Sequence, residues 1–216
     1  MDKKIILPIT LIVLIGFVIF VSANSMTGGN DSPYIVEADV FEGWNIIAGI
    51  YPAGGAILSN SEIKESDIKA IWYYSPILKK YVQIHPNLDS DSLGMLDDDV
   101  VLTSAMWVYS EKTGILKYST LEDYMPLSFR KFSTGWNFFT ITPDIAGKTP
   151  SDVKGTCNFE KIYGYDPTIR DWVIFPLDED FYKDIVGVGL VIKATNDCTL
   201  GLVEGNGNNV PPPIPN

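Results

Sequence analysis

The chain contains one unit written twice, and this duplication constrains its fold more than any other feature. Residues 42–47 (EGWNII) recur as residues 134–139 (TGWNFF), 92 positions later. Three further matches follow in the same order: 71–76 with 162–167, 81–86 with 172–176, and 105–109 with 188–192. Because four landmarks keep their order, we interpret them as a true internal repeat. We therefore expect two homologous units, over residues 40–130 and 131–204.

Each unit is predicted to begin with a strand and a short helix. The Gly-Trp-Asn motif opens runs of β-branched and aromatic residues over 44–51 and 136–141, which are typical of strands. A serine ahead of Glu62 predicts a capped helix start in the first unit. In the second unit, Thr149 is a suitable cap and Pro150 a suitable first helical residue.

Two hairpins are expected to complete each unit. Ser75-Pro76 and Asp166-Pro167 start the turns of the first hairpins, because proline fixes φ at the second turn position. The strands of these hairpins are expected at 71–74 with 81–84, and at 162–165 with 172–175. The second hairpins are expected at 106–109 with 115–118, and at 190–194 with 199–202.

These elements indicate a β-rich α+β fold. We expect the two strand–helix–hairpin–hairpin units to pack as a pseudo-symmetric pair after an N-terminal apolar helix. An all-β sandwich or barrel is the alternative. A repeat of about 90 residues is too long for a propeller blade or a solenoid.

The N-terminus has a membrane-targeting pattern. Lys3 and Lys4 precede the uncharged apolar segment 5–21, whose length of about 20 residues matches the hydrocarbon core of a bilayer. Lysines ahead of such a segment favour export of the chain that follows it. The segment runs into Val21-Ser22-Ala23, a pattern that a signal peptidase could cut. Residues 1–23 are therefore either a retained anchor, with the C-terminal part outside, or a signal peptide cleaved after Ala23.

The segments that flank the repeats have the composition of linkers. Residues 24–39 begin with a Gly-, Ser- and Asn-rich stretch and are predicted to form a linker. Within it, Asn30 fits the glycosylation acceptor pattern together with Asp31 and Ser32. Residues 205–216 end in VPPPIPN and are predicted to form a disordered tail.

The exported part is acidic. Without residues 1–23 it holds 14 Lys and Arg against 26 Asp and Glu, which gives 14 − 26 = −12. Nucleic acid is therefore not an expected partner, since phosphate binding needs the opposite sign. The expected partners are the membrane, through the apolar segment, and a surface protein or glycan.

The two cysteines, Cys157 and Cys198, both lie in the second unit. An exported compartment permits a disulfide, and the even count supports one. Free buried thiols and a metal site are the alternatives. The spacing does not match the paired cysteines of a zinc site.

One acidic loop resembles a calcium-binding loop. Oxygen ligands at Asn87, Asp89 and Asp91, with Asp98 at the twelfth position, match part of that pattern. The sixth position is Ser92, where the sharp turn of a calcium loop requires glycine. A solvated acidic loop is the default interpretation, with weak calcium binding as the alternative and no other cofactor expected.

No catalytic constellation stands out in the sequence. His85 is the single histidine, and it lies beside Pro86 at the end of a predicted hairpin strand. A structural role, in which His85 lines the turn, is a better interpretation than a role in a Ser-His-Asp triad. The chain is therefore not predicted to be an enzyme; a hydrolase that uses carboxylates is the enzymatic alternative.

Three motifs together resemble a known repeat. They are the Gly-Trp-Asn openings, the Tyr165-Asp166-Pro167…Trp172 segment, and the run 187–200 (GVGLVIKATNDCTL). These resemble a repeat of exported archaeal and bacterial surface proteins, a repeat of uncharacterised function. The Gly-Tyr-Trp segment of that repeat is degenerate here, at 105–107 and 188–190. The resemblance implies a cell-surface or accessory domain and provides no catalytic residues to transfer.

Aromatic residues are abundant in both units and allow two interpretations. Because successive side chains of a strand point to opposite faces, we expect most of them to pack a core. A face that binds carbohydrate or a protein partner is the alternative. The predicted function is a non-catalytic exported surface module for adhesion, envelope structure or protein contact, with carbohydrate binding through exposed aromatics as the alternative. The aromatic residues in question are Trp44, Trp72, Tyr73, Tyr74, Tyr81, Trp107, Tyr109, Trp136, Tyr163, Tyr165 and Trp172.

Overall fold

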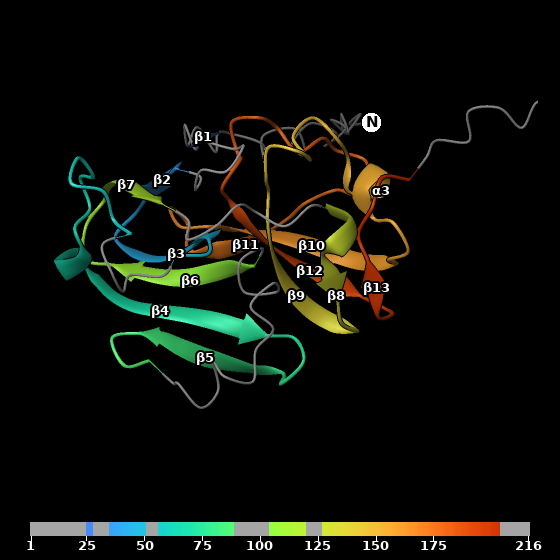
Figure 1. The fold of residues 1–216 in the computed structure, drawn as a ribbon, viewed down its shortest axis with the longest axis horizontal. Helices are drawn as coiled ribbons and strands as arrows, with labels where there is room; N and C mark the ends of the chain where they lie inside the picture. Colours follow the sequence, from blue (N-terminus) through green and yellow to red (C-terminus); the bar gives the residue numbers. More distant parts are fainter. Residues whose placement is uncertain (1–24, 28–34, 51–55, 89–103, 120–126, 204–216) are drawn as a thin grey trace, which may run out of the picture.

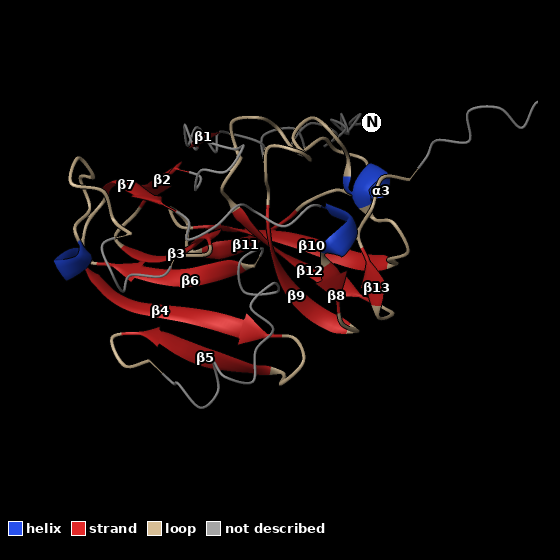
Figure 2. Ribbon diagram, in the orientation of Figure 1, coloured by secondary structure: helices blue, strands red, loops and turns tan. Residues whose placement is uncertain are grey.

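The computed structural model describes residues 25–27, 35–50, 56–88, 104–119 and 127–203 (Figure 1). These residues form several antiparallel sheets that do not close into a barrel. Figure 2 shows how little helix accompanies the strands. The β-rich prediction is confirmed, and the all-β sandwich alternative fits this architecture better than the α+β form.

The helical elements in the described part of the chain are short. They are the 3-10 helices η1 (Glu65–Asp67) and η2 (Leu127–Phe129) and the α-helix α3 (Pro150–Val153). In these described ranges no helix has the length and apolar character needed to span a bilayer. The apolar segment 5–21 lies outside the described residues.

A four-stranded antiparallel sheet forms the centre of each repeat, and the two sheets have the same strand order. In both, the first strand pairs with the fourth, the fourth with the second, and the second with the third. The first sheet contains β3 (Gly43–Ala48), β4 (Ile68–Ser75), β5 (Lys80–His85) and β6 (Ala105–Ser110). The second contains β9 (Gly135–Thr140), β10 (Phe159–Asp166), β11 (Asp171–Ile174) and β12 (Gly189–Ala194).

A smaller sheet accompanies each large one. In each repeat, the strand that precedes the large sheet in the sequence pairs with the strand that follows it. These pairs are β2 (Ile35–Val40) with β7 (Gly114–Ser119), and β8 (Lys131–Phe132) with β13 (Cys198–Thr199). Strand β1 (Ser25–Thr27) extends the first of these sheets by pairing with β2. Strand β2 begins at Ile35, inside the segment predicted as a linker, because Val36, Ala38 and Val40 are buried at alternate positions.

The predicted second hairpins are wrong in their pairing. Strand β7 pairs with β2 instead of β6, and β13 pairs with β8 instead of β12. Both edges of β6 are already occupied, by β3 and β4, and both edges of β12 by β9 and β10. The chain therefore has to leave the large sheet after its fourth strand, although the next strand follows almost at once.

The predicted first hairpins are confirmed. Strands β4 and β5 pair around residues 76–79, and β10 and β11 pair around residues 167–170. Both turns end on a residue in the left-handed region at the same repeat position, Lys79 with φ 52° and Arg170 with φ 56°.

The short helices agree with the prediction in one repeat and differ in the other. In the second repeat, the Thr149 hydroxyl accepts a hydrogen bond from the backbone N–H of Asp152, and Pro150 is the first helical residue, as predicted. In the first repeat, the helix starts at Glu65 instead of Glu62. The Ser61 hydroxyl donates to the carbonyl of Ile63 and so does not cap a helix.

Each repeat has its own hydrophobic core between its large and small sheets. The core of the first repeat includes Val36 from β2, Ile71 from β4 and Leu116 from β7. The core of the second includes Phe132 from β8 and Ile162 from β10. One face of each large sheet is therefore buried in the core of its own repeat.

Candidate binding cleft between the two repeats

The opposite face of each large sheet is aromatic. In β4, Ile71 and Tyr73 are buried in the core, whereas Trp72 and Tyr74 are only partly buried. Since side chains alternate along a strand, Trp72 and Tyr74 point away from that core. In β10 the same alternation places Tyr163 and Tyr165 on the face opposite Ile162.

The two aromatic faces contact each other through a small apolar cluster. Ile46 and Ala105 of the first sheet pack against Phe138 and Val191 of the second. The backbone N–H of Ala48 donates a hydrogen bond to the carbonyl of Gly187 at 2.8 Å. The main chains of the two repeats are thus joined at this contact.

The contact is so close that it requires a glycine. A Cβ atom on Gly189 would lie 2.2 Å from Cγ2 of Ile46 and 2.4 Å from Cβ of Ala105. Side-chain atoms at such distances overlap, so any larger residue would push the sheets apart. Gly189 therefore determines how near the two aromatic faces lie.

Aromatic rings from both repeats meet beside this contact. The Trp107 ring lies edge-on to Tyr165, with centroids 4.9 Å apart, and edge-on to Trp172 at 5.6 Å. On the second sheet, Phe138 contacts Tyr74 at 5.4 Å between centroids. The two Trp107 pairs are edge-to-face and the Tyr74–Phe138 pair is tilted, with 36° between the ring planes; such contacts are favourable for aromatic rings and join the two faces.

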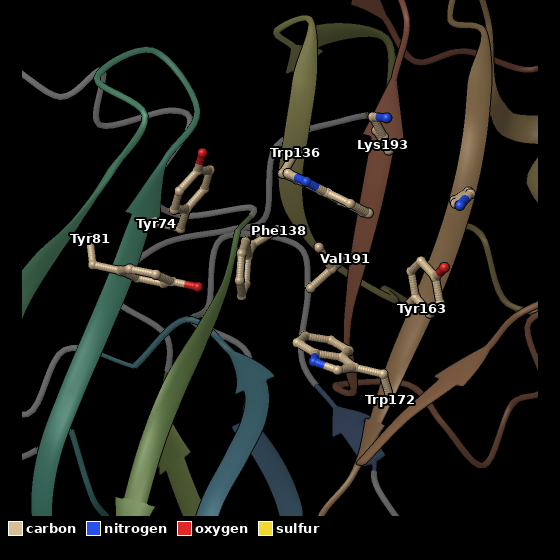
Figure 3. Close-up of a pocket in the computed structure, with 9 residues that line it drawn as sticks. Tyr74, Tyr81, Trp136, Phe138, Tyr163, Trp172, Val191 and Lys193 are labelled. Carbon is tan, nitrogen blue, oxygen red and sulfur yellow. The ribbon is translucent and has the colours of Figure 1, made fainter.

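Two pockets open between the aromatic faces, and we call them together the aromatic cleft. The lysine pocket has a volume of about 390 Å³, and in Figure 3 Tyr74 and Tyr81 lie across it from Trp136, Tyr163 and Trp172. Its lining is Tyr74, Tyr81, Trp136, Phe138, Lys161, Tyr163, Trp172, Val191 and Lys193. The tryptophan pocket has a volume of about 410 Å³ and is lined by Trp44, Trp72, Tyr81, Trp107 and Tyr165.

The two pockets are lined by residues from equivalent positions of the two repeats. Trp136, Tyr163 and Trp172 in the lysine pocket occupy the repeat positions of Trp44, Trp72 and Tyr81 in the tryptophan pocket. Each pocket is also lined by a tyrosine of the other repeat at a shared repeat position, Tyr74 for the lysine pocket and Tyr165 for the tryptophan pocket, and Tyr81 of the first repeat lines both pockets. All five tryptophans of the chain line the cleft.

The strand ladders correct one detail of the predicted repeat. The sequence comparison aligned Trp107 with Leu190, but Leu190 pairs with Phe139 in the same way that Met106 pairs with Ile47. Trp107 therefore corresponds to Val191. A shift of one residue moves a side chain to the other face of a strand, and Val191 indeed lines the lysine pocket.

The polar groups of the cleft are tyrosine hydroxyls, tryptophan indole N–H groups and lysine ammonium groups. The Lys193 ammonium lies 2.9 Å from a carboxylate oxygen of Glu160 and 5.9 Å from the centroid of the Trp136 ring. Burial, with a smaller contribution from Tyr81, raises the pKa of Tyr74 above its usual value. The Tyr74 hydroxyl therefore stays neutral and can donate a hydrogen bond.

The expectation that most of the aromatic residues pack a core is wrong. Of the eleven residues named above, only Tyr73 is buried in a hydrophobic core. The others lie on the faces that the repeats turn towards each other or towards solvent. The signal was present in the sequence, because Trp72 and Tyr74 alternate with Ile71 and Tyr73 along one strand.

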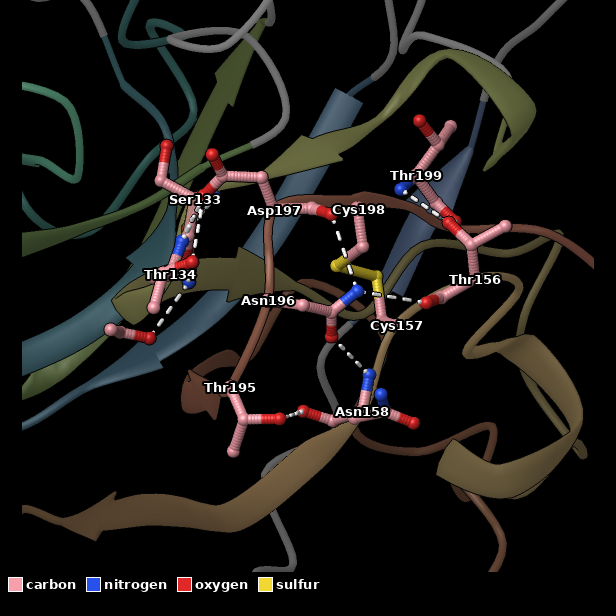
Figure 4. Close-up of a disulfide and its surroundings, with 12 residues drawn as sticks. Ser133, Thr134, Thr156, Cys157, Asn158, Thr195, Asn196, Asp197, Cys198 and Thr199 are labelled. Atoms are coloured by element: carbon pink, nitrogen blue, oxygen red, sulfur yellow. Dashed lines mark hydrogen bonds between the residues drawn. A yellow bond between two sulfur atoms is a disulfide. The ribbon is translucent and has the colours of Figure 1, made fainter.

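The predicted disulfide is confirmed and lies away from the cleft. Cys157 and Cys198 are bonded with their Cα atoms 4.9 Å apart, in the core of the second repeat (Figure 4). The adjacent Asn196 accepts a hydrogen bond from the backbone N–H of Asn158 and donates one to the carbonyl of Thr156. The disulfide and this asparagine together fasten β13 to the segment that follows α3.

Most of the other predicted site residues lie outside the part of the chain that the structure describes. Asn87 is exposed just after β5, whereas Asp89, Asp91 and Asp98 of the calcium candidate lie outside the described residues, as does Asn30. Within the described ranges, His, Cys, Asp and Glu side chains form no group of three or more that could hold a metal ion. His85 is the last residue of β5, so its predicted place at the end of a hairpin strand is confirmed, and its side chain is partly buried.

Comparison of the chain with protein-family models, with curated proteins and with solved structures finds no match.

Proposed function

We propose that the chain is a non-catalytic, exported cell-surface module that binds a carbohydrate chain in the aromatic cleft. The observation that carries this proposal is the gathering of all five tryptophans around two adjacent pockets. Tryptophan and tyrosine present a broad apolar face and a polar edge. The C–H face of a sugar ring fits the apolar face, and its hydroxyls fit the polar edge.

The arrangement of the pockets favours an extended ligand. Tyr81 lines both pockets, and Trp172 of the lysine pocket contacts Trp107 of the tryptophan pocket. We propose that the two repeats form a pseudo-symmetric pair in which each provides one subsite. Successive rings of one glycan would then occupy the two subsites.

Binding without hydrolysis agrees with the lining of the cleft. Glycoside hydrolases use a pair of carboxylates on either side of the bond that they cleave. Among the described residues that line the two pockets, none is Asp or Glu.

Three features support a place at the cell surface. The N-terminal apolar segment fits a membrane anchor or signal, with the repeats outside. The disulfide fits an oxidising compartment. The resemblance to a repeat of exported surface proteins agrees with both.

Contact with a neighbouring surface protein is the second candidate function. Strand β11 is the outer strand of its sheet, and Ile174 at its end is 66% exposed. An open strand edge can accept a strand of another chain. A partner bound there would lie beside the cleft, since Trp172 of the lysine pocket is also on β11.

A glycan array tests the carbohydrate proposal. The full chain in mild detergent should bind a subset of oligosaccharides. Trp172→Ala should weaken that binding about tenfold or more, since it removes one stacking wall. Phe129→Ala is the matched control, because Phe129 is 64% exposed and lines neither pocket. Binding that both variants retain would contradict the proposal. Binding that is displaced by choline, a quaternary ammonium ligand of aromatic pockets, but not by sugars would also contradict it.

A further inference from the structure

We propose that the lysine pocket takes an acidic sugar, a uronic acid, while the tryptophan pocket takes a neutral one. This inference rests on the proposed carbohydrate function. It identifies the chemical class of the ligand and the residues that select it, Lys161 and Lys193.

The two lysines distinguish two otherwise similar pockets. In the ladders, Lys193 pairs with Trp136 in the second repeat, and Tyr109 pairs with Trp44 at the same place in the first. Lys161 occupies the repeat position of Ala70. The second repeat therefore adds two cationic side chains to a pocket whose counterpart has none among its lining residues.

These lysines stand directly opposite each other. Lys161 on β10 pairs with Lys193 on β12 in the strand ladder. Like charges at directly opposite positions destabilise a sheet. An anionic ligand between them would remove this repulsion, so the pair is easier to explain as a binding feature than as a structural one.

The pair is only partly neutralised by the protein. Glu160 forms an ion pair with Lys193, and within the described part of the chain Lys161 has no ion-pair partner. In a chain of net charge −11, two cations in one aromatic pocket without a lining carboxylate are a local exception. This charge is complementary to an anion.

A carboxylate on a sugar ring fits this geometry. In a uronic acid the carboxyl group is attached directly to the ring, so a ring stacked on the aromatic walls places it at the ring edge. The Lys193 ammonium is already held over the Trp136 ring, 5.9 Å from its centroid. Lys161 lies directly opposite Lys193 on the neighbouring strand and lines the same pocket, so a carboxylate bound there would have a lysine on each of two adjacent strands.

Paired oligosaccharides test the inference. Calorimetry on the full chain in detergent would compare oligogalacturonate and oligomannuronate with their carboxyl-reduced, neutral counterparts. At least one acidic form should bind about five- to tenfold more tightly than its neutral counterpart, as expected for two partly exposed ion pairs. The preference should shrink as salt is raised.

Charge-removing variants locate the effect. The double variant Lys161→Gln with Lys193→Gln should lose the preference for the acidic form while its affinity for the neutral form stays within about twofold, because the aromatic walls remain. Lys183→Gln removes one positive charge from an exposed position outside the cleft and should leave the preference unchanged. A thermal midpoint no lower than that of the unmodified chain would show that the double variant is folded.

Four results would overturn the inference. Three of them are equal affinity for acidic and neutral forms, a preference that survives in the double variant, and a stronger preference for a sulfated oligosaccharide than for either uronate. Trp172-dependent binding of neutral glycans alone would also overturn it, and would leave the proposed carbohydrate function intact. The two proposals can therefore fail separately.

Discussion

Asn45 and Asn137 lie 92 positions apart and make the same three hydrogen bonds. Each side-chain oxygen accepts from the backbone N–H of the residue four positions earlier, at 2.9 Å from Phe41 and 3.0 Å from Ser133. Each side-chain amide donates to the carbonyl of that same residue at 2.8 Å and to the glycine two positions earlier at 3.0 Å. Both glycines have φ near 105–110°. The Gly-Trp-Asn motif is thus a bend that is locked by asparagine and presents its tryptophan to the cleft.

We predict that Asn137→Ala lowers the free energy of unfolding by about 2–4 kcal/mol, since three hydrogen bonds of about 1 kcal/mol each are lost at a buried site. Asn137→Asp keeps the acceptor but loses both donors, so its loss of unfolding free energy should lie between those of the unmodified chain and Asn137→Ala, or exceed that of Asn137→Ala. Urea denaturation of the full chain in detergent measures both changes. A loss below about 0.5 kcal/mol for Asn137→Ala would show that the bend does not depend on this side chain.

Gly189 provides a test of the contact between the repeats. A Cβ at this position would overlap Ile46 and Ala105, so Gly189→Ala should cost about 1–3 kcal/mol of stability, the usual range for overpacking. It should also weaken ligand binding, because the aromatic faces are pushed apart. Gly164→Ala is the control: a Cβ there would lie 3.7 Å from the nearest atom, in ordinary contact. Equal effects of the two substitutions would contradict the close approach.

The disulfide should stabilise the second repeat without taking part in binding. Its cysteines are 41 positions apart, and a loop of that size corresponds to about 3–4 kcal/mol in the chain-entropy description. Replacing both cysteines by alanine should therefore lower stability by about that amount. Ligand affinity should stay unchanged under conditions where the variant is folded. Denaturation and calorimetry measure the two effects, and a large loss of affinity in the folded variant would contradict the assignment.

Stability should fall in acid. A hydrogen bond from Lys112, followed by one from the backbone of Lys64, lowers the pKa of Asp67 below its ordinary 3.8. The backbone N–H and then the hydroxyl of Thr134 lower the pKa of Asp197 in the same way. A pKa that is lower in the folded state than in the unfolded one adds stability above the unfolded value, and this stability is lost as pH falls below it.

We therefore expect the free energy of unfolding to be nearly flat above about pH 5 and to decrease below about pH 4. Asp197→Asn should make the decrease shallower, because one of the contributing carboxyl groups is removed. Chemical denaturation across a pH series measures both slopes. A profile of Asp197→Asn with an unchanged slope would contradict the role given to this carboxylate.

Much of each repeat was predictable because its signals are local. Gly-Trp-Asn predicted the first strands, Ser75-Pro76 and Asp166-Pro167 the first hairpins, and Thr149-Pro150 the start of α3. The disulfide followed from the even number of cysteines and from the predicted export of the chain. Each of these inferences depends on residues close together in the sequence or on a choice with few alternatives.

The remainder depended on contacts between distant segments. Adjacency in the sequence favours a hairpin of β6 with β7, but β6 has no free edge, so β7 pairs with β2. The alignment of Trp107 with Leu190 is off by one residue, which only the ladders reveal. The cleft combines Tyr74 of one repeat with Trp136 of the other, and this combination requires knowing how the two sheets meet.

Tryptophan emission tests the central claim most directly, because all five tryptophans line the cleft. The full chain would be titrated with an oligosaccharide selected on the array, while emission and its quenching by acrylamide are followed. The proposal predicts a saturable change in emission and protection from acrylamide at the concentrations where calorimetry detects binding. Saturable binding that leaves both emission and quenching unchanged would place the ligand elsewhere and contradict the cleft as the binding site.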